Sequence, residues 1–241
     1  MKIAIIAAME QECALLRSRL TEASHNNYYQ LQISTGLLDG VPVVLTQCGI
    51  GKVNAALATS TIINTFSPRA VINTGCAGGL VAHLKQGDVV IANDVAHHDV
   101  DVTAFGYTYG QVPQQPPRYP ADLRLLNTAR MMANKLQKII PEHHLYEGLV
   151  VSGDQFICET DCKQKILRNF PKAVAAEMEA SSIAQVCHSL HTPCLVVRSI
   201  SDNGDESATQ SFHEFLTLAA QNSADIVQQL AKSFYNSLLA D

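Results

Sequence analysis

The fold class follows from residues 172–202, which read KAVAAEMEASSIAQVCHSLHTPCLVVRSISD. Two runs in this segment, 173–176 and 194–197, are apolar at every position, as strands buried on both faces are. Between them, residues 179–190 place apolar side chains three and four positions apart, which is typical of a helix. The segment therefore predicts a strand, a helix and a second strand, the repeating unit of α/β proteins.

The same alternation recurs along the chain. Further apolar runs are KIAIIAA (2–8), VPVVLT (41–46), AVINTG (70–75), DVVIAN (88–93) and GLVVSG (148–153), and further helix-length segments are 51–66, 120–136 and 210–239. Residues 28–46 instead predict a hairpin that bends at Asp39-Gly40, so the sheet is expected to be mixed and covered by helices on both faces. Residues 107–120 contain four prolines and show neither the helical nor the strand spacing of apolar residues. They predict a long loop, which is either functional or a surface excursion without a role.

Composition limits the possible functions. The chain has 241 residues, of which 47% are hydrophobic and 16% charged, so we expect one globular domain, residues 1–241. Its net charge of −5 offers no basic surface to nucleic acid or to an anionic membrane. The apolar run 3–9 is too short to cross a membrane, and no cleavage site follows it. Seven cysteines, an odd number in mostly apolar surroundings, argue against a disulfide framework and predict a cytoplasmic protein.

Three predicted strands end in polar or glycine-rich clusters, GCAGG (75–79), EMEAS (177–181) and SDNGD (201–205). Ligands of α/β sheets bind where the carboxyl ends of strands meet loops, so we expect the clusters to share one pocket. Glu177 and Glu179 cannot both face the same way if their strand continues. A carboxylate there suits a pair of hydroxyl groups, and Asp202 at a buried strand end would be kept protonated, as a general acid must be.

Each of these residues has a simpler interpretation. Glu12 follows the first strand and is more typical of an exposed helix. Glu179 could serve only the N-terminus of the next helix, and Asp202 only a turn. The cluster Asp94, His97, His98, Asp99 and Asp101 suggests a metal site. Neighbouring histidines point apart in a strand, however, and no helical histidine pair or CxxC motif frames them. We therefore predict a solvated loop and no metal.

Eight segments together resemble one known family: MKIAIIAAMEQE (1–12), CGIGKVNAA (48–56), NTGCAGG (73–79), VTAFGYTYGQVP (102–113), SGDQFI (152–157), AAEMEASSIA (175–184), RSISDNGD (198–205) and SFHEF (211–215). In order and spacing they are similar to the 5′-methylthioadenosine/S-adenosylhomocysteine nucleosidases of the purine nucleoside phosphorylase-like superfamily. The resemblance covers residues 1 to about 220. It implies a three-layer αβα sandwich around a mixed, partly closed sheet, a homodimer, and hydrolysis of the adenine N-glycosidic bond of a small nucleoside without a cofactor.

The resemblance also implies roles for single residues. Glu12 matches the base that activates water, and Asp202 the acid that protonates adenine N7. Glu179 and Met178 match the ribose contacts, and Arg198 the residue that arranges water and carboxylates. Phe156 matches the ring stacked on adenine, and Ile157 the backbone that reads the purine edge. The remaining expected substrate contacts are Met9, Ile50, Cys76, Glu177, Ser201 and Phe212, with Val102, Phe105 and Pro113 supplied by the partner subunit.

Three residues depart from the family pattern: Cys76 stands where serine is common, Ala176 where valine is common, and His97 replaces an aromatic residue. The Cys76 change weakens a hydrogen bond, because a thiol is a poor donor. Two other functions remain open. A purine nucleoside phosphorylase on the same fold needs a basic phosphate clamp, and the strand end that would supply its arginine carries Asn73. A non-catalytic nucleoside-binding module would release no adenine. Deoxyadenosine and aminodeoxyfutalosine remain alternative substrates.

Overall fold

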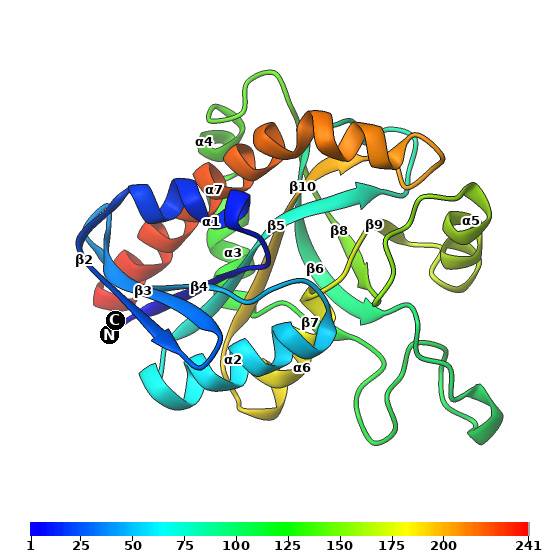
Figure 1. Ribbon diagram of the computed structural model, residues 1–241, viewed down its shortest axis with the longest axis horizontal. Coiled ribbons are helices and arrows are strands. Elements are labelled where there is room, and N and C mark those ends of the chain that lie inside the picture. The colour runs from blue at the N-terminus through cyan, green and yellow to red at the C-terminus, as the bar shows by residue number, and fades with distance from the viewer. Residues whose placement is uncertain (241) are drawn as a thin grey trace.

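A ten-stranded mixed sheet forms the centre of the molecule (Figure 1). The computed structural model describes residues 1–240. The strands are β1 (Ile3–Ala7), β2 (Leu20–Tyr28), β3 (Leu31–Leu38), β4 (Val41–Gln47), β5 (Ala70–Gly79), β6 (Val89–His97), β7 (Tyr119–Pro120), β8 (Leu145–Ser152), β9 (Ala173–Glu177) and β10 (Cys194–Asp202). They lie in the order β10-β6-β8-β9-β5-β1-β4-β3-β2, and β7 pairs with β6.

The sheet is partly closed, because β10 pairs with β5 as well as with β6. Strands β5, β9, β8, β6 and β10 thereby form a ring. The pairs β1–β4, β1–β5 and β5–β10 are parallel, so these strands end at one edge of the sheet. Strand β9 runs antiparallel to β5, with Ala176 opposite Gly78, and brings Glu177 to the same place.

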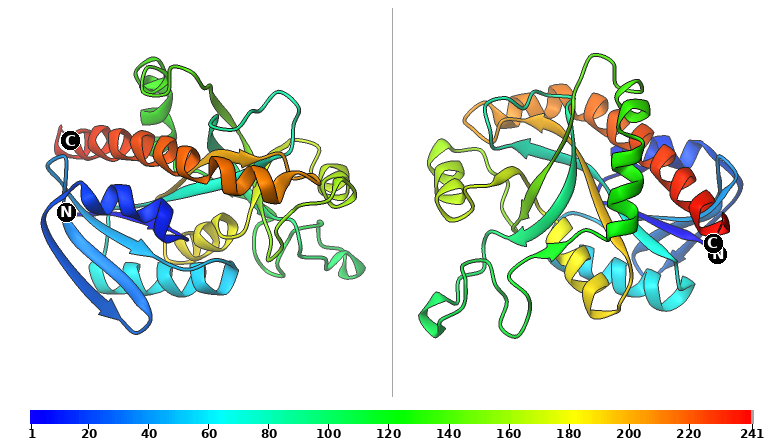
Figure 2. Two further views of the ribbon diagram at one scale, coloured as in Figure 1. Left: turned by 45° about the horizontal axis from the view of Figure 1, so that its top comes forward. Right: turned by 180° about the vertical axis from the view of Figure 1, so that it is seen from behind.

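Helices cover both faces of the sheet, as the left view of Figure 2 shows. They are α1 (Glu10–Ser18), α2 (Lys52–Phe66), η1 (Thr103–Phe105), α3 (Leu123–Met131), α4 (Ala133–Gln137), α5 (Thr160–Asn169), α6 (Ala180–Ser189) and α7 (Ala208–Ala240). Helices α1, α3 and α7 pack on one face, and α2 and α6 on the other. None of the helices described over residues 1–240 is long and apolar enough to span a membrane.

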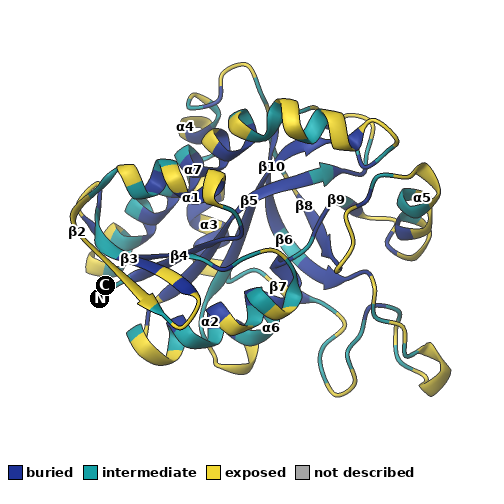
Figure 3. Cartoon of the chain, viewed as in Figure 1, coloured by how far each residue is buried: buried dark blue, intermediate teal, exposed yellow. Residues whose placement is uncertain are grey.

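The core lies on both sides of the central strands, which Figure 3 shows as buried. Alternate residues of β1 take opposite sides: Ile3 and Ile5 pack with α1, α3 and α7, whereas Ala4 and Ile6 pack with α2 and α6. This explains why both alternations of the strand sequences are apolar. The prediction of a three-layer αβα sandwich with a mixed central sheet is confirmed.

Several predicted elements have different bounds. The hairpin at Asp39-Gly40 is present and joins β3 to β4, but β3 begins at Leu31 rather than at Tyr28. The helix predicted over 120–136 is two helices, α3 and α4, which meet at Met132. Residues 107–118 lack regular structure, as predicted, and the loop that contains them projects from the body of the protein (Figure 1).

Candidate active site

The carboxyl ends of the central strands enclose a cleft of about 480 Å³. Most of the residues singled out in the sequence line it. Its lining consists of Ala8, Met9, Glu12, Ile50, Cys76, Ala77, Gly78, Phe156, Ala176, Glu177, Met178, Glu179, Ser201, Asp202 and Phe212. The expectation that three strand-end clusters share one pocket is therefore met.

Glu12 lies at the floor of the cleft and is 2% exposed, so the interpretation as an exposed helix residue is wrong. Its Oε2 accepts the backbone N–H groups of Ala8 at 2.9 Å and Met9 at 3.0 Å, which lie at the end of β1 and the start of α1. Its Oε1 accepts the N–H of Cys76 from β5 at 2.9 Å. Gly75 makes this approach possible, because a Cβ there would lie 2.6 Å from Oε1. Glu12 is thus held as an acceptor facing the cleft.

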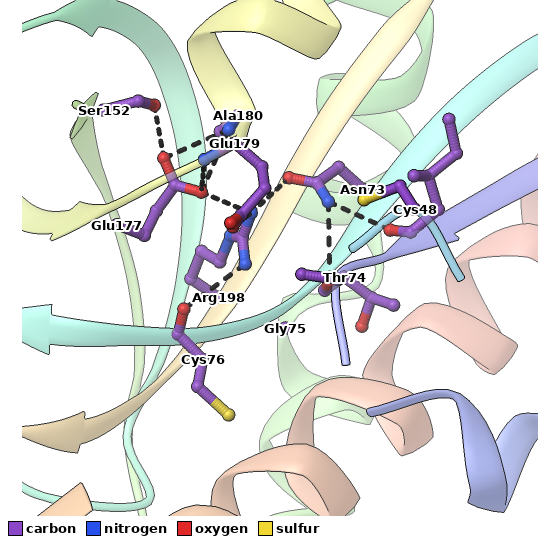
Figure 4. Close-up of polar contacts among 12 residues, drawn as sticks. Cys48, Asn73, Thr74, Gly75, Cys76, Ser152, Glu177, Glu179, Ala180 and Arg198 are labelled. Carbon is purple, nitrogen blue, oxygen red and sulfur yellow. Dashed lines mark hydrogen bonds and ion pairs between the residues drawn. The ribbon is translucent and has the colours of Figure 1, made fainter. Parts of the chain in front are cut away.

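Arg198 lies beneath the cleft, 1% exposed, and ties its acidic residues together (Figure 4). Its Nη2 forms an ion pair with Glu177, lies 3.5 Å from Glu179 Oε2, and donates to Asn73 Oδ1 at 2.7 Å. Its Nη1 donates to the Cys76 carbonyl at 3.3 Å. Asn73 in turn donates to the carbonyl of Ile6 at 2.9 Å. Arg198 therefore does not line the cleft but fixes the groups that do.

Both carboxylate oxygens of Glu177 have protein partners (Figure 4). Besides Arg198, its carboxylate accepts the hydroxyl of Ser152 and the N–H groups of Glu179 and Ala180, the latter two at 2.9 Å. It, and not Glu179, thus binds the N-terminus of α6. Because β9 ends at Glu177, the alternation of a continuing strand does not apply, and both glutamates approach Arg198.

Glu179 enters the cleft from the residue before α6. Its Oε1 accepts the N–H of Gly51 at 2.9 Å. Burial raises the pKa of the Glu179 carboxyl, and the charge of Glu177 adds to the rise, while Arg198 and the Gly51 N–H oppose it. A carboxylate with few protein partners is available to ligand hydroxyls.

Asp202 is the last residue of β10 and is 2% exposed. Burial raises the pKa of its carboxyl, although hydrogen bonds from the Gly204 N–H and the Ser201 hydroxyl, at 2.9 and 2.8 Å, act against the rise. The sequence predicted this direction from desolvation. The turn expected in the simpler interpretation is also present, since Asp202 accepts from the residue two positions later.

Cys76 lines the cleft as a neutral thiol. Burial raises the pKa of its thiol well above the ordinary value, and the charge of Glu12 adds to the rise. Because a thiol is a weak donor, Cys76 supplies less hydrogen bonding here than a serine would.

The mouth of the cleft is apolar. Phe156 and Phe212 meet edge to face, with ring centroids 5.7 Å apart and an interplanar angle of 76°. Phe156 is 41% exposed and Ile50 is 52% exposed, so the entrance is open. Together with Met9 and Met178, these side chains offer a flat ring and an apolar channel to a ligand.

Some expected site residues lie elsewhere. Ile157 is buried beside the cleft and lines a neighbouring cavity of about 780 Å³. Val102, Phe105 and Pro113 lie outside the cleft of their own chain, in the projecting loop between β6 and β7. Four lining residues were not assigned from the sequence: Ala8, Ala77, Gly78 and Ala176. All are small, and only the GCAGG cluster pointed to such residues.

Two residues of the suspected metal cluster, His97 and Asp99, are bonded to other side chains. His97 contacts Ser181 Oγ at 2.8 Å and Gln185 Oε1 at 2.9 Å, and Asp99 pairs with Lys52 at 2.7 Å. His97 and His98 are buried, so the expectation of a solvated loop is wrong for them. Among residues 1–240, no group of three or more potential ligands is placed to hold a metal ion.

The chain is similar to proteins of one family over almost its whole length. The model of the phosphorylase superfamily matches residues 2–232. A 5′-methylthioadenosine/S-adenosylhomocysteine nucleosidase of Exiguobacterium is 47% identical, over 96% of this chain and 98% of that protein. The crystal structure of the nucleosidase of that name from Neisseria meningitidis, in complex with methylthio-immucillin-A, is 46% identical with a TM-score of 0.92, covering 96% of this chain and 99% of that one. A futalosine hydrolase of Helicobacter pylori is 33% identical with a TM-score of 0.89, covering 98% of both chains.

Proposed function

This chain belongs to the phosphorylase superfamily and, within it, to the 5′-methylthioadenosine/S-adenosylhomocysteine nucleosidases, and we infer that it hydrolyses the N-glycosidic bond of these two nucleosides. The products are adenine and the 5′-substituted ribose. One observation carries the assignment to this cleft: Glu12, from the first turn of α1, and Asp202, from the end of β10, line the same space together with Glu179, which lies 3.5 Å from Arg198.

In the proposed mechanism the two carboxyl groups divide the work. Glu12 accepts a proton from the attacking water, whose oxygen bonds to C1′ while the bond from C1′ to N9 breaks. Asp202 gives its proton to N7, so adenine leaves as a neutral molecule. This is an inverting arrangement, with a base and water on one side of the sugar and an acid on the other.

The other assignments fit the same pose. Glu179 accepts the 2′ and 3′ hydroxyls of the ribose, against Met178. Phe156 stacks on adenine. The Ile157 backbone and Asp202 bind the edge of the purine, and the Ser201 hydroxyl donates to the Asp202 carboxyl. Met9, Ile50 and Phe212 enclose the 5′ alkylthio group, and Cys76 lies beside Glu12. Glu177 lines the cleft and also forms an ion pair with Arg198, so it positions this guanidinium beside the substrate.

We further propose a cytoplasmic homodimer with a single nucleosidase domain that uses neither metal nor cofactor and binds no nucleic acid or membrane. Phe105 is 82% exposed, and Ile50, Val53 and Leu57 form an exposed apolar strip along the start of α2. A second copy would cover this strip and place its own Val102, Phe105 and Pro113 at the open mouth.

Measurement of adenine release from methylthioadenosine tests the function. The wild-type protein is expected to release adenine, and Glu12→Gln is expected to bind adenine with little turnover. A protein that binds adenine but releases none from methylthioadenosine, adenosylhomocysteine or 5′-deoxyadenosine would be a binding module instead. The likeness to a futalosine hydrolase makes aminodeoxyfutalosine the further substrate to include.

A further inference from the structure

Three segments far apart in the sequence meet beside the cleft, and three hydrogen bonds join them. Lys52 begins α2, Asp99 follows β6, and Asp154 follows β8. Lys52 Nζ donates to Asp99 Oδ1 at 2.7 Å, and the N–H of Asp154 donates to Asp99 Oδ2 at 3.0 Å. The N–H of Lys52 donates to Asp154 Oδ1 at 2.7 Å. The three residues therefore form a closed ring of contacts.

The ring is charged and lies at the surface, with Asp154 exposed. The side chains of Lys52 and Asp99 are 20% and 28% exposed. Burial acts to raise the pKa of Asp99, but the hydrogen bonds from Lys52 and from the Asp154 N–H outweigh it, so the pKa is lowered. Asp154 accepts at the N-terminus of α2, where the helix dipole favours a negative charge.

Gly51 allows the Asp154 carboxylate to approach the N-terminus of α2. Its φ of +96° lies in the left-handed region, and a Cβ at this position would lie only 3.0 Å from Asp154 Oδ1. The carboxylate of Asp154 therefore occupies the space that any other residue would fill with its side chain.

None of the three side chains lines the cleft, but each is attached to a part of it. The N–H of Gly51, one residue before Lys52, donates to Glu179 at 2.9 Å, and Ile50 lies at the mouth. Phe156 follows Asp154 by two residues. Asp99 begins the loop that carries Phe105. Movement at any one of these three residues would shift the groups expected to hold ribose and adenine.

We propose that Lys52, Asp99 and Asp154 form a positioning network that sets the affinity of the cleft for its nucleoside, by fixing the Phe156 loop and the Gly51 amide against each other. The identity of the ligand in this proposal rests on the proposed function. It touches neither the reacting atoms nor Glu12 and Asp202. It therefore acts on binding and not on the chemical step.

The test compares Asp99→Asn and Lys52→Met with the wild type, using kcat and KM for methylthioadenosine and the calorimetric Kd for adenine. Each variant is expected to raise KM and Kd about tenfold while kcat changes by less than about twofold. Asp39→Asn and Lys232→Met are matched controls, since this ion pair has a similar distance of 2.8 Å but lies away from the cleft. The controls are expected to leave KM, Kd and kcat unchanged.

Two further variants separate a network from a general loss of structure. The double variant Asp99→Asn/Lys52→Met is expected to be no worse than either single variant, because residues of one network are not additive. Lys52→Arg keeps the charge and is expected to restore most of the affinity. The proposal is overturned if KM and Kd stay within twofold of wild type, if the effects add, or if kcat falls as far as kcat/KM.

Failure of the proposed function gives a different result. A wild-type protein that binds adenine but hydrolyses no nucleoside contradicts the function, while the adenine Kd of the same variants still decides the network. If adenine does not bind the wild type, both proposals are wrong.

Discussion

Asp202 and Glu179 are buried carboxyls in one cleft, and their surroundings suit them to opposite tasks. Asp202 accepts from a backbone N–H and a hydroxyl and has no cation among its hydrogen-bond partners, whereas Glu179 faces Arg198 and the Gly51 amide. Burial raises the pKa of both carboxyls. At Glu179, Arg198 and the Gly51 amide oppose the rise and orient its oxygens as acceptors for hydroxyl groups, whereas Asp202 keeps a proton that it can give up.

Replacement of the acid tests the first of these tasks. Asp202→Asn keeps the shape of the side chain but has no proton to give, so turnover is expected to fall roughly 10²- to 10⁴-fold, the usual worth of general acid catalysis. Adenine binding, measured by calorimetry, is expected to persist. A 7-deaza analogue of the substrate, which lacks N7, is expected to bind and resist cleavage by the wild type. Turnover of Asp202→Asn near the wild-type rate would place the acid elsewhere.

The pH dependence of KM tests the second task. The pKa of Glu179 is raised, so lowering the pH protonates it earlier than an ordinary glutamate and removes an acceptor for the ribose hydroxyls. KM for methylthioadenosine is therefore expected to rise as pH falls through this pKa and to level off above it. Glu12, Glu177 and Arg198 are the charged groups that face Glu179.

Glu179→Gln is the matched variant. It is expected to have a high KM that no longer depends on pH across the same range, because its amide does not titrate. The same pH dependence in wild type and variant would show that another group is responsible.

Residue types and their order predicted most of the cleft, including Glu12, Glu179 and Asp202. The task of Glu177 was not predictable in this way. Whether it points to substrate or to Arg198 depends on where β9 ends, and the end of a strand depends on its neighbours in the sheet.

Helix α7 is hydrogen-bonded to the sheet beside the residues that line the cleft. Ser223 is fully buried in α7, and its Oγ contacts Thr74 Oγ1 at 2.7 Å, the N–H of Gly75 at 3.2 Å and the Val197 carbonyl at 3.4 Å. One side chain thus joins α7 to β5 and β10 next to the residues that position Glu12.

Removal of this hydroxyl is expected to destabilise the fold. Ser223→Ala leaves the Gly75 N–H and the Thr74 hydroxyl without this partner, at a cost of about 1–3 kcal/mol in the free energy of unfolding. Urea unfolding measures the change. Ser237→Ala is the control on the same helix, because the Ser237 hydroxyl donates to the Phe234 carbonyl within one turn of α7 and its loss is expected to change little. If the two substitutions lowered the free energy of unfolding equally, Ser223 would not be the residue that joins α7 to the sheet.

The elements that the sequence did not predict share a lack of apolar periodicity. Strand β2 reads LTEASHNNY and is exposed along most of its length, because it is the edge strand and pairs only with β3. Helix α5 reads TDCKQKILRN, with a single buried residue, Ile166. Central strands and buried helices were predictable because burial imposes their pattern, whereas these peripheral elements are held by pairing and by few contacts.

The whole molecule is proposed to work as a pair, with each active site drawing Phe105 from its neighbour. A mixing experiment tests this arrangement. Glu12→Gln and Phe105→Ala are each expected to have low activity as homodimers. When the two are co-expressed, half of the dimers are mixed, and each mixed dimer has one site with both Glu12 and the partner's Phe105 intact.

Activity in the mixture is expected to recover to about a quarter of the wild-type value, since about a quarter of all sites are then intact. Activity no higher than the average of the two separate variants would show that Phe105 does not act across subunits.

The central claim is that water, and not phosphate, attacks the sugar. It is tested by incubating the protein with methylthioadenosine in H₂¹⁸O that contains phosphate, and identifying the sugar by mass spectrometry. Asn73 accepts from Arg198 and donates to the Ile6 carbonyl, and Arg198 is paired with Glu177, so within residues 1–240 the cation beside this strand end is already bonded to the protein rather than available as a phosphate clamp. The expected products are adenine and free methylthioribose carrying one ¹⁸O atom, at a rate independent of phosphate. Formation of methylthioribose 1-phosphate, or a rate that requires phosphate, would contradict the account.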